Sequence, residues 1–456
     1  MRDLHELPAA RQSLLLRSGT LSACELVDHY LERIRSVDPE LHAFTSVTED
    51  AAWLRARAVD ALPDEARGPL HGLVLADKDL VARAGVVTGR GSRLHDAQPA
   101  AEDDAVIVVL DGAGGVSVGK TATPEYGMYG YTEPFGAPLP RNPWDRSLSP
   151  GGSSGGAAVA VAAGLVSAAT GTDGGGSVRI PAAATGLVGL KPGRGVVPVD
   201  RMRVGRLPLV STGPLARTAE DAALVYSALH GGIPVPLADP PRLRVGMTTD
   251  SPWDATHPVV VSPEAREAVE IAARALAAAG HEVVPFHLPE QDAYGPAFRD
   301  LWALLAAAIP ATGEEQLALL EPITRTLLER GRALDEAARD TLFDTLEGLN
   351  GLFRGRFADV DLVLTPSLAL TPRPLGWYDA VDPGRNFDQQ VFYSPFTSFV
   401  NVTGLPAITL PVAETTAGLP MGAQLIGRDG DENLLLALAA QLEGPNGWAD
   451  RRPPGL

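Results

Sequence analysis

The sequence predicts an α/β fold: a single large domain whose mixed, mainly parallel central sheet is covered by helices on both faces. Three observations support this prediction. Strand-like runs alternate with helical patterns along the chain, as they do in proteins with a covered parallel sheet. No low-complexity linker divides the 456 residues, and hydrophobic residues make up 45% of them, which is ample for a large core. We therefore expect one domain over residues 1–456.

Local signals justify the elements of the first half of the chain. Ser22 and Glu25 form a capping-box pattern, which places the single cysteine, Cys24, in the first turn of an ordinary amphipathic helix. One cysteine cannot form an intrachain disulfide. Helical patterns run over about 22–37, 48–61 and 102–112, and strand-like runs lie near 72–76, 115–119 and 166–171.

The second half continues the alternation. Ser262 and Pro263 start a helix with a good cap and a proline in its first turn, and Gly280 ends it. Residues 290–356 are rich in Leu and Ala and should be largely helical. Strands are expected in HEVVPFHL, DLVLTPSL, LPAITLPV and GAQLIG, followed by a final helix over Asp431–Glu443.

Two glycine-rich segments that carry serines lie within this pattern. Ser153 and Ser154 occur in GGSSGG and Ser177 in DGGGSVR, on either side of the uncharged run AAVAVAAGLVSAAT. That run should be buried helix and then strand, so the glycine segments are not linkers. Glycine lets the backbone approach a ligand closely, and consecutive N–H groups in such a turn can hold an anion. Buried glycine loops with hydroxyl groups are typical of a catalytic site.

Lysine is rare in this chain. Of its 38 basic residues only Lys78, Lys120 and Lys191 are lysines. A desolvated lysine can lose its proton near neutrality, whereas arginine cannot. Lys78 ends an apolar strand-like run and is the candidate base; the alternative is a solvated surface lysine. Neighbours in a strand alternate faces, so Asp77 and Asp79 should point away from Lys78.

Together these segments resemble the amidase signature family, the Ser-cisSer-Lys amidohydrolases. GPLHGLVLADKDL resembles the lysine block of that family, and GGSSGG with TDGGGSVRIPA and GLVGLKPGRG resembles its core signature. NVTGLPAITLPVAETTAGLPMGAQLIG is similar to its closing strands. The resemblance runs from about residue 20 to 445 and is weakest around 285–355. Leu80 and Gly174 depart from the family pattern without removing a reacting group.

The resemblance implies a bacterial amidase that cleaves the C–N bond of a non-peptide linear amide through an acyl-enzyme and needs no cofactor. Its triad corresponds to Ser177 as nucleophile, Ser153 as proton bridge and Lys78 as base. Burial would lower the pKa of that lysine as this role requires. The family also has a cis peptide before the bridging serine, here Gly152–Ser153. The oxyanion hole would be the N–H groups of Gly174, Gly175, Gly176 and Ser177, with Ser154, Asp173 and Arg179 as supporting residues.

Substrate-binding residues are expected in the aromatic loop PEYGMYGYTEPFG and in later loops. Aromatic loop residues often mark an apolar pocket with a few polar groups, although half of them could simply pack the loop. We expect a signature core over about 70–220 and a helical region over about 285–356 that shapes the pocket. The candidates are Glu125, Tyr126, Met128, Tyr131, Trp377 and Phe396.

Two other motif patterns are present, and the sequence around them argues against both. Gly114–Thr121 satisfies the phosphate-loop pattern, but its valines make the tract itself strand-like and Pro124 follows it in place of a helix. Gly151–Gly155 satisfies the G-x-S-x-G nucleophile elbow, but RNPWDRSLSP precedes it in place of an apolar strand. Neither pattern has the surroundings that its chemistry needs.

Composition narrows the class of partner. The net charge of −18 argues against nucleic acid or an anionic membrane, and no Cys/His cluster has metal-ligand spacing. The N-terminus is too charged for a signal peptide, so we expect a cytoplasmic enzyme acting on a small-molecule amide. A homodimer stays open. The alternatives are the glutamine-hydrolysing A subunit of a tRNA-dependent amidotransferase and, from another class, a non-catalytic binding module on the same fold.

Overall fold

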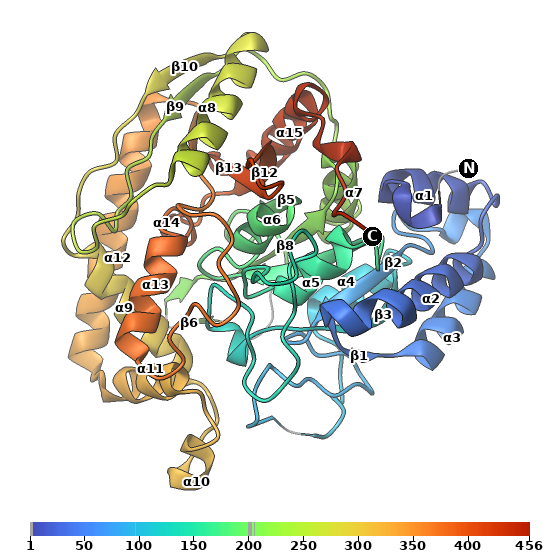
Figure 1. The fold of residues 1–456 in the computed structure, drawn as a ribbon, viewed down its shortest axis with the longest axis horizontal. Helices are drawn as coiled ribbons and strands as arrows, with labels where there is room; N and C mark the ends of the chain where they lie inside the picture. Colours follow the sequence, from blue (N-terminus) through green and yellow to red (C-terminus); the bar gives the residue numbers. More distant parts are fainter. Residues whose placement is uncertain (1–2, 96, 199–202, 205) are drawn as a thin grey trace.

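An eleven-stranded sheet forms the centre of the molecule in the computed structural model (Figure 1). The structure describes residues 3–95, 97–198, 203–204 and 206–456. A separate two-stranded ribbon pairs β6 (Arg203–Val204) with β7 (Leu207–Pro208). The strands of the large sheet are β1 (Phe44–Val47), β2 (Val74–Lys78), β3 (Val116–Thr121), β4 (Ala168–Asp173), β5 (Val188–Lys191), β8 (Ser211–Ala216), β9 (Arg244–Met247), β10 (Glu282–Pro285), β11 (Leu362–Pro366), β12 (Ala407–Glu414) and β13 (Pro420–Ile426).

The sheet is mixed, and its order is β1-β3-β2-β4-β8-β5-β12-β13-β11-β9-β10. Parallel pairs occur in two groups, β3-β2-β4 and β11-β9-β10. The central pairs from β4 to β11 are antiparallel. The predicted α/β class and mixed sheet are confirmed. The centre is less parallel than alternating helices and strands suggest, because a short loop joins β12 directly to β13 and such a connection makes neighbours antiparallel.

Helices cover the sheet. In the described chain the strands β2, β3, β4, β5, β8 and β11 are buried along their whole length, as strands covered on both faces are. The helices are α1 (Ala9–Arg17), α2 (Ala23–Leu41), α3 (Glu49–Asp60), α4 (Ala105–Gly112), α5 (Gly155–Ala162), α6 (Arg179–Thr185), α7 (Ala219–Leu229), α8 (Pro263–Ala278), α9 (Tyr294–Ala307), α10 (Gly313–Leu317), α11 (Pro322–Ala333), α12 (Glu336–Arg356), α13 (Pro383–Tyr393), α14 (Ser398–Thr403) and α15 (Glu432–Asn446).

The predicted helix starts are confirmed in detail. The Ser22 side chain accepts the Glu25 N–H, the Glu25 carboxylate accepts the Ser22 N–H, and half-buried Cys24 packs in the first turn of α2. The Ser262 hydroxyl accepts the Ala265 N–H at the start of α8. Each cap satisfies a backbone N–H that has no partner within its own helix.

The two alternative motifs take the shapes that their sequence surroundings predict. The last six residues of GGVSVGKT are β3 itself, and buried Lys120 donates to the Val81 carbonyl. GGSSGG is a loop that leads into α5, and residues 149–154 before that helix contain no strand. The apolar run that follows is helix α5 and then strand β4, as predicted.

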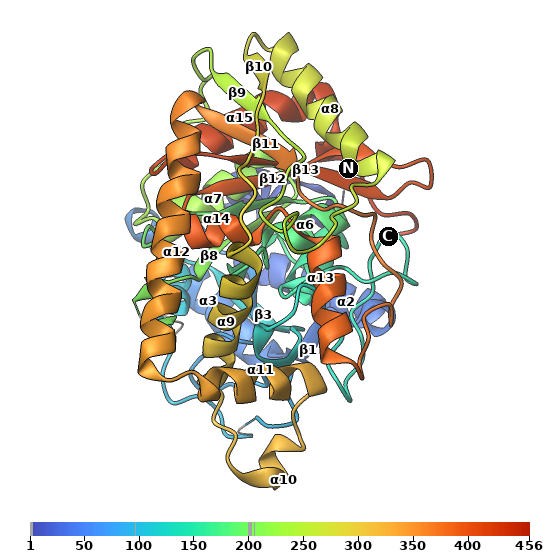
Figure 2. The ribbon, with the colours of Figure 1, turned by 90° about the vertical axis from the view of Figure 1, so that its left-hand side faces the viewer.

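A helical layer formed by α9, α11, α12 and α13 lies along one side of the sheet, in front of it in Figure 2. Helix α9 packs against α11 and α12, and α11 also contacts α13. This is the region that was predicted to be largely helical, with the addition of α13 from later in the chain. The signature core predicted over about 70–220 includes residues 96, 199–202 and 205, which lie outside the described residues.

Candidate active site

Lys78 lies at the carboxyl end of β2, beside its parallel neighbour β4. Its ammonium nitrogen Nζ lies 2.6 Å from the Ser153 hydroxyl oxygen and 2.9 Å from the Thr172 hydroxyl oxygen. The carboxyl ends of parallel strands meet at one edge of a sheet, so β2 and β4 bring residues 94 positions apart together. Lys78 therefore contacts the first glycine-rich segment, GGSSGG, through Ser153. It also contacts β4, the strand that leads into the second segment, through Thr172.

Burial determines the charge of Lys78. The residue is 1% exposed, and burial lowers its pKa to about 7 while the negative charge of Asp173 opposes the shift. Lys120 and Lys191 are equally buried, so no lysine of this chain is a solvated surface residue. A substantial fraction of Lys78 is consequently neutral near pH 7 and can accept a proton.

The two aspartates beside Lys78 point away from it, as the alternation along a strand predicts. The Asp77 carboxylate accepts hydrogen bonds from Arg83 at 2.6 Å and from the Ser117 hydroxyl at 2.9 Å. The Asp79 carboxylate accepts the Gly89 N–H at 3.1 Å. Neither carboxylate keeps Lys78 charged.

The loop that carries the paired serines touches the loop that carries Ser177. The Ser154 N–H donates to the Ser177 carbonyl at 3.2 Å, and the Ser154 hydroxyl is 3.5 Å from the Thr172 carbonyl. The peptide bond Gly152–Ser153 is cis, as the family resemblance implied. Lys78 therefore contacts Ser153 directly, and Ser177 lies in the neighbouring loop, which is joined to the serine pair through the backbone. Thr172 adds a hydroxyl that the sequence analysis did not single out.

The glycine turn before Ser177 is held by a buried ion pair. The Asp173 carboxylate forms an ion pair with the Arg179 guanidinium, with 2.8 Å between oxygen and nitrogen. It also accepts hydrogen bonds from the N–H groups of Gly176 at 2.8 Å and Val178 at 3.1 Å. Burial alone would raise the pKa of Asp173, but the adjacent Arg179, helped by other donors, holds it well below its usual range. The Gly176 N–H already donates to Asp173, so it is not available to an oxyanion. Of the four predicted donors, the N–H groups of Gly174, Gly175 and Ser177 are left.

Arg179 also connects distant parts of the chain. Its guanidinium donates to the side-chain oxygens of Gln424 at 2.7 Å and Asn401 at 2.6 Å. Asn401 in turn donates to the Asp173 backbone carbonyl at 2.8 Å. The sequence analysis missed Asn401 and Gln424, because they lie more than 220 residues from Arg179 and have no local motif.

Breaking this pair should destabilise the protein strongly. Arg179→Met leaves the fully buried Asp173 carboxylate without its cation, and we expect a loss of roughly 3–5 kcal/mol in the free energy of unfolding. Arg35→Gln, which removes an exposed ion pair with Glu49, is the matched control and should cost roughly 1 kcal/mol or less. Urea denaturation at pH 7 measures both. Equal losses in the two variants would show that the buried pair does not hold the turn.

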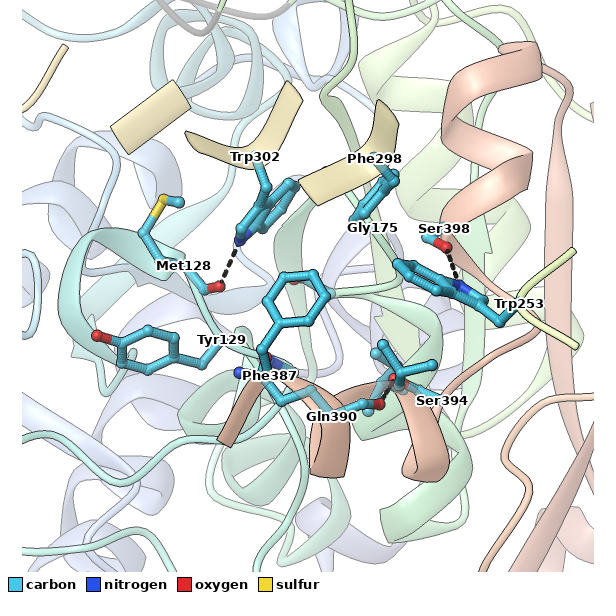
Figure 3. A pocket seen from close by; sticks show the side chains of 14 residues that line it. Met128, Tyr129, Gly175, Trp253, Phe298, Trp302, Phe387, Gln390, Ser394 and Ser398 are labelled. Atoms are coloured by element: carbon cyan, nitrogen blue, oxygen red, sulfur yellow. Dashed lines mark hydrogen bonds between the residues drawn. The ribbon is translucent and has the colours of Figure 1, made fainter. Parts of the chain in front are cut away.

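A pocket opens beside Ser177 (Figure 3). Its cavity volume is about 60 Å³, so it is a narrow pocket. Among the described residues that line it, none has a charged side chain, and most are aromatic or aliphatic. They are Met128, Tyr129, Gly130, Gly175, Ser177, Ile180, Trp253, Phe298, Trp302, Phe387, Gln390, Val391, Ser394 and Ser398.

Comparison with known proteins decides the family. The sequence model of the amidase family matches residues 25–436. The chain belongs to the amidase family. It is accordingly a hydrolase that acts on amide C–N bonds.

Relatives of this amidase cover its whole length. AmiB2 of Mycobacterium tuberculosis (strain ATCC 25618 / H37Rv), which is named as an amidase, is 37% identical over 99% of this chain and 98% of its own. The A subunit of the Glutamyl-tRNA(Gln) amidotransferase of Coxiella burnetii (strain Dugway 5J108-111) is 32% identical over 99% of each chain. A solved structure of 6-aminohexanoate cyclic dimer hydrolase with its substrate has a TM-score of 0.88 at 30% identity and covers 99% of both chains.

Of the residues proposed from the sequence to bind substrate in this amidase, Met128 lines the pocket. The Glu125 carboxylate accepts the Ser92 hydroxyl at 2.7 Å and the Glu321 N–H at 2.8 Å, so it fastens the aromatic loop to the start of α11. The Tyr126 hydroxyl donates to the Leu94 carbonyl.

The remaining candidates lie behind or beside the pocket wall. Tyr131 stacks between Tyr129 and Tyr378, and Trp377 meets the edge of Tyr378. Phe396 is fully buried in the core under α8 and α15. Aromatic residues in loops were the signal used, and in the loop PEYGMYGYTEPFG the rings of Tyr129 and Tyr131 stack on each other.

Four of the pocket residues that the sequence analysis missed lie on two helices, and two others, Tyr129 and Trp253, lie in loops. Phe298 and Trp302 on α9, and Phe387 and Val391 on α13, are pairs with helical spacing in regions outside the family motifs. Their four-residue spacing is the signal that could have found them.

The described residues offer no group of three or more His, Cys, Asp or Glu side chains placed to hold a metal ion. Nor does the described part of the chain contain a helix with the length and apolar character needed to cross a membrane.

Proposed function

We propose that this amidase hydrolyses carboxylic acid amides through an acyl-enzyme on Ser177, with Ser153 as proton bridge and Lys78 as base. The observation that carries the proposal is the 2.6 Å contact between buried Lys78 and Ser153, in a loop hydrogen-bonded to Ser177. A serine hydroxyl is a weak nucleophile and needs such a base within hydrogen-bond reach.

The reaction has two halves. As the Ser177 oxygen bonds to the amide carbon, its proton passes to the Ser153 oxygen, and the Ser153 proton passes to neutral Lys78. The resulting oxyanion accepts hydrogen bonds from the N–H groups of Gly174, Gly175 and Ser177. The proton returns along the same route to the amine as the C–N bond breaks. Water then bonds to the ester carbon and gives up a proton through Ser153 to Lys78, and this proton returns through Ser153 to the Ser177 oxygen as the acyl C–O bond breaks and the acid leaves.

The pocket favours an uncharged substrate over glutamine. Free glutamine carries an ammonium and a carboxylate, and burying either without a partner of opposite charge is costly. The described lining of the pocket offers no charged partner. We therefore propose a free-standing hydrolase of small-molecule amides in preference to the glutamine-hydrolysing subunit of an amidotransferase, and the clustered triad argues against a non-catalytic binding module. A cytoplasmic location and action without nucleic acid or membrane remain part of the proposal.

A panel of amides tests this choice. We expect kcat/KM for benzamide and propionamide to exceed that for glutamine by about 100-fold or more, since an unpaired buried charge costs several kcal/mol. Ammonia release is the measurement, and Ser177→Ala is the blank. Preference for glutamine would contradict the free-standing hydrolase, and absence of turnover on every amide would contradict the proposed function itself.

A further inference from the structure

The pocket beside Ser177 has two helical walls that face each other. On α9, Phe298 and Trp302 are one turn apart, and their rings stack with centroids 5.5 Å apart and planes 18° apart. On α13, Phe387 and Val391 have the same spacing and also line the pocket, and Phe387 stands opposite Phe298 and Trp302 (Figure 3). The size of the group that enters is therefore set by side chains on two helices outside the catalytic segments.

Trp302 and Phe298 are wall residues whose rings lie over the glycine turn before Ser177. A Cβ atom added at Gly174 would lie 3.4 Å from the Trp302 ring, and one added at Gly175 would lie 3.4 Å from the Phe298 ring. Both distances are ordinary contact distances for an added methyl group, so the two rings lie about one methyl group away from the glycine turn that precedes Ser177. Ser177 and Trp302 line the same pocket, so an acyl group on Ser177 shares that space with the indole.

The indole is also fixed in orientation. Its Nε1 donates to the Met128 carbonyl at 2.8 Å, which joins α9 to the aromatic loop (Figure 3). A half-buried tryptophan with a satisfied N–H cannot swing aside without losing that bond. Trp302 thus forms a rigid end to the pocket.

Charged residues beside the pocket connect its two helical walls. Arg299, which follows Phe298 on α9, pairs with Asp388 on α13 at 3.0 Å. The Arg299 guanidinium also lies 4.3 Å from the centre of the Phe387 ring. These two contacts link α9 to α13 beside the pocket.

We propose that Trp302 is the specificity-determining residue that limits the length of the acyl group, so that this amidase acts on amides of short, uncharged acids up to about the size of benzoic acid. This inference rests on the proposed role of Ser177. It goes further by naming the residue that selects the substrate, on a helix that the family motifs do not include.

Two substitutions test the proposal. Trp302→Leu shortens the wall, and Trp302→Phe keeps an aromatic ring but removes the extra ring and the hydrogen bond to Met128. We expect the ratio of kcat/KM for biphenyl-4-carboxamide to that for benzamide to rise about tenfold or more in Trp302→Leu, and by less in Trp302→Phe. If Trp302→Leu fails to fold, the Trp302→Phe ratio alone decides.

Trp144→Leu is the matched control. Trp144 is also half-buried and donates its Nε1 to a backbone carbonyl, that of Thr185 at 2.7 Å, but it does not line the pocket. Its substitution should leave the ratio of the two substrates unchanged. An unchanged ratio in both Trp302 variants, with benzamide still cleaved, would overturn the proposal and leave the function of Ser177 intact. A wild-type enzyme that hydrolyses no amide and is not labelled on Ser177 by a fluorophosphonate probe would instead overturn the proposed function.

Discussion

Ser177→Ala should lower kcat for amide hydrolysis by roughly 10,000-fold or more, because no other group takes the place of an absent nucleophile. The Ser177 side chain is nearly buried, and alanine removes one oxygen, so the folded structure should be retained. Amide turnover at pH 8 measures the loss, and circular dichroism with a thermal melt checks the fold.

Ser154→Ala is the neighbouring control for Ser177→Ala. The Ser154 hydroxyl makes one long contact, 3.5 Å to the Thr172 carbonyl, so its removal should reduce kcat far less than removal of the nucleophile. Full activity in Ser177→Ala together with an inactive Ser153→Ala would instead make Ser153 the nucleophile, as the G-x-S-x-G pattern suggests.

Replacing Lys78 should have the second largest effect. Lys78→Met retains the length of the side chain without a proton acceptor, and we expect kcat to fall between roughly 100- and 10,000-fold. Lys78→Arg retains a positive charge that cannot be given up near neutrality, so it should be as inactive as Lys78→Met. Recovery of activity in Lys78→Arg would show that charge, not proton transfer, is the role of Lys78.

The pH dependence follows from the same lysine. Burial lowers the pKa of Lys78 to about 7, and the base must be neutral to act. Activity should therefore be low at pH 5, rise through about pH 7 and level off above it. The profile of kcat measured between pH 5 and 9 checks this. A profile that falls as pH rises through 7 would require a protonated group and contradict the assignment.

Local sequence signals predicted most of the elements. The caps at Ser22 and Ser262 and the apolar run after Ser154 each specify their structure through neighbouring residues, and all three are found where predicted. The pairing of strands was harder to predict. Whether β12 meets β13 parallel or antiparallel depends on the connection and on distant neighbours, which no local pattern reports.

The residues of the candidate site likewise include some that local sequence identifies and others that only tertiary contacts reveal. The Lys78, Ser153 and Ser177 segments have distinctive compositions, so they could be singled out before their contacts were known. Thr172 is a common residue type in a strand, and nothing local indicates that its hydroxyl faces Lys78. The pocket walls depend on how α9 and α13 pack. Several aromatic residues of the nearer loop were wrongly predicted to line the pocket, because composition alone does not show which ring faces solvent and which faces another ring.

Labelling with a fluorophosphonate probe, followed by intact-mass measurement and peptide mapping, tests the central claim most directly. Such a probe bonds to an activated serine hydroxyl. We expect a single adduct on Ser177 in the wild-type protein and a much slower reaction in Lys78→Met. An adduct on Ser153, or amide turnover that persists with Ser177 unlabelled, would contradict the proposed triad.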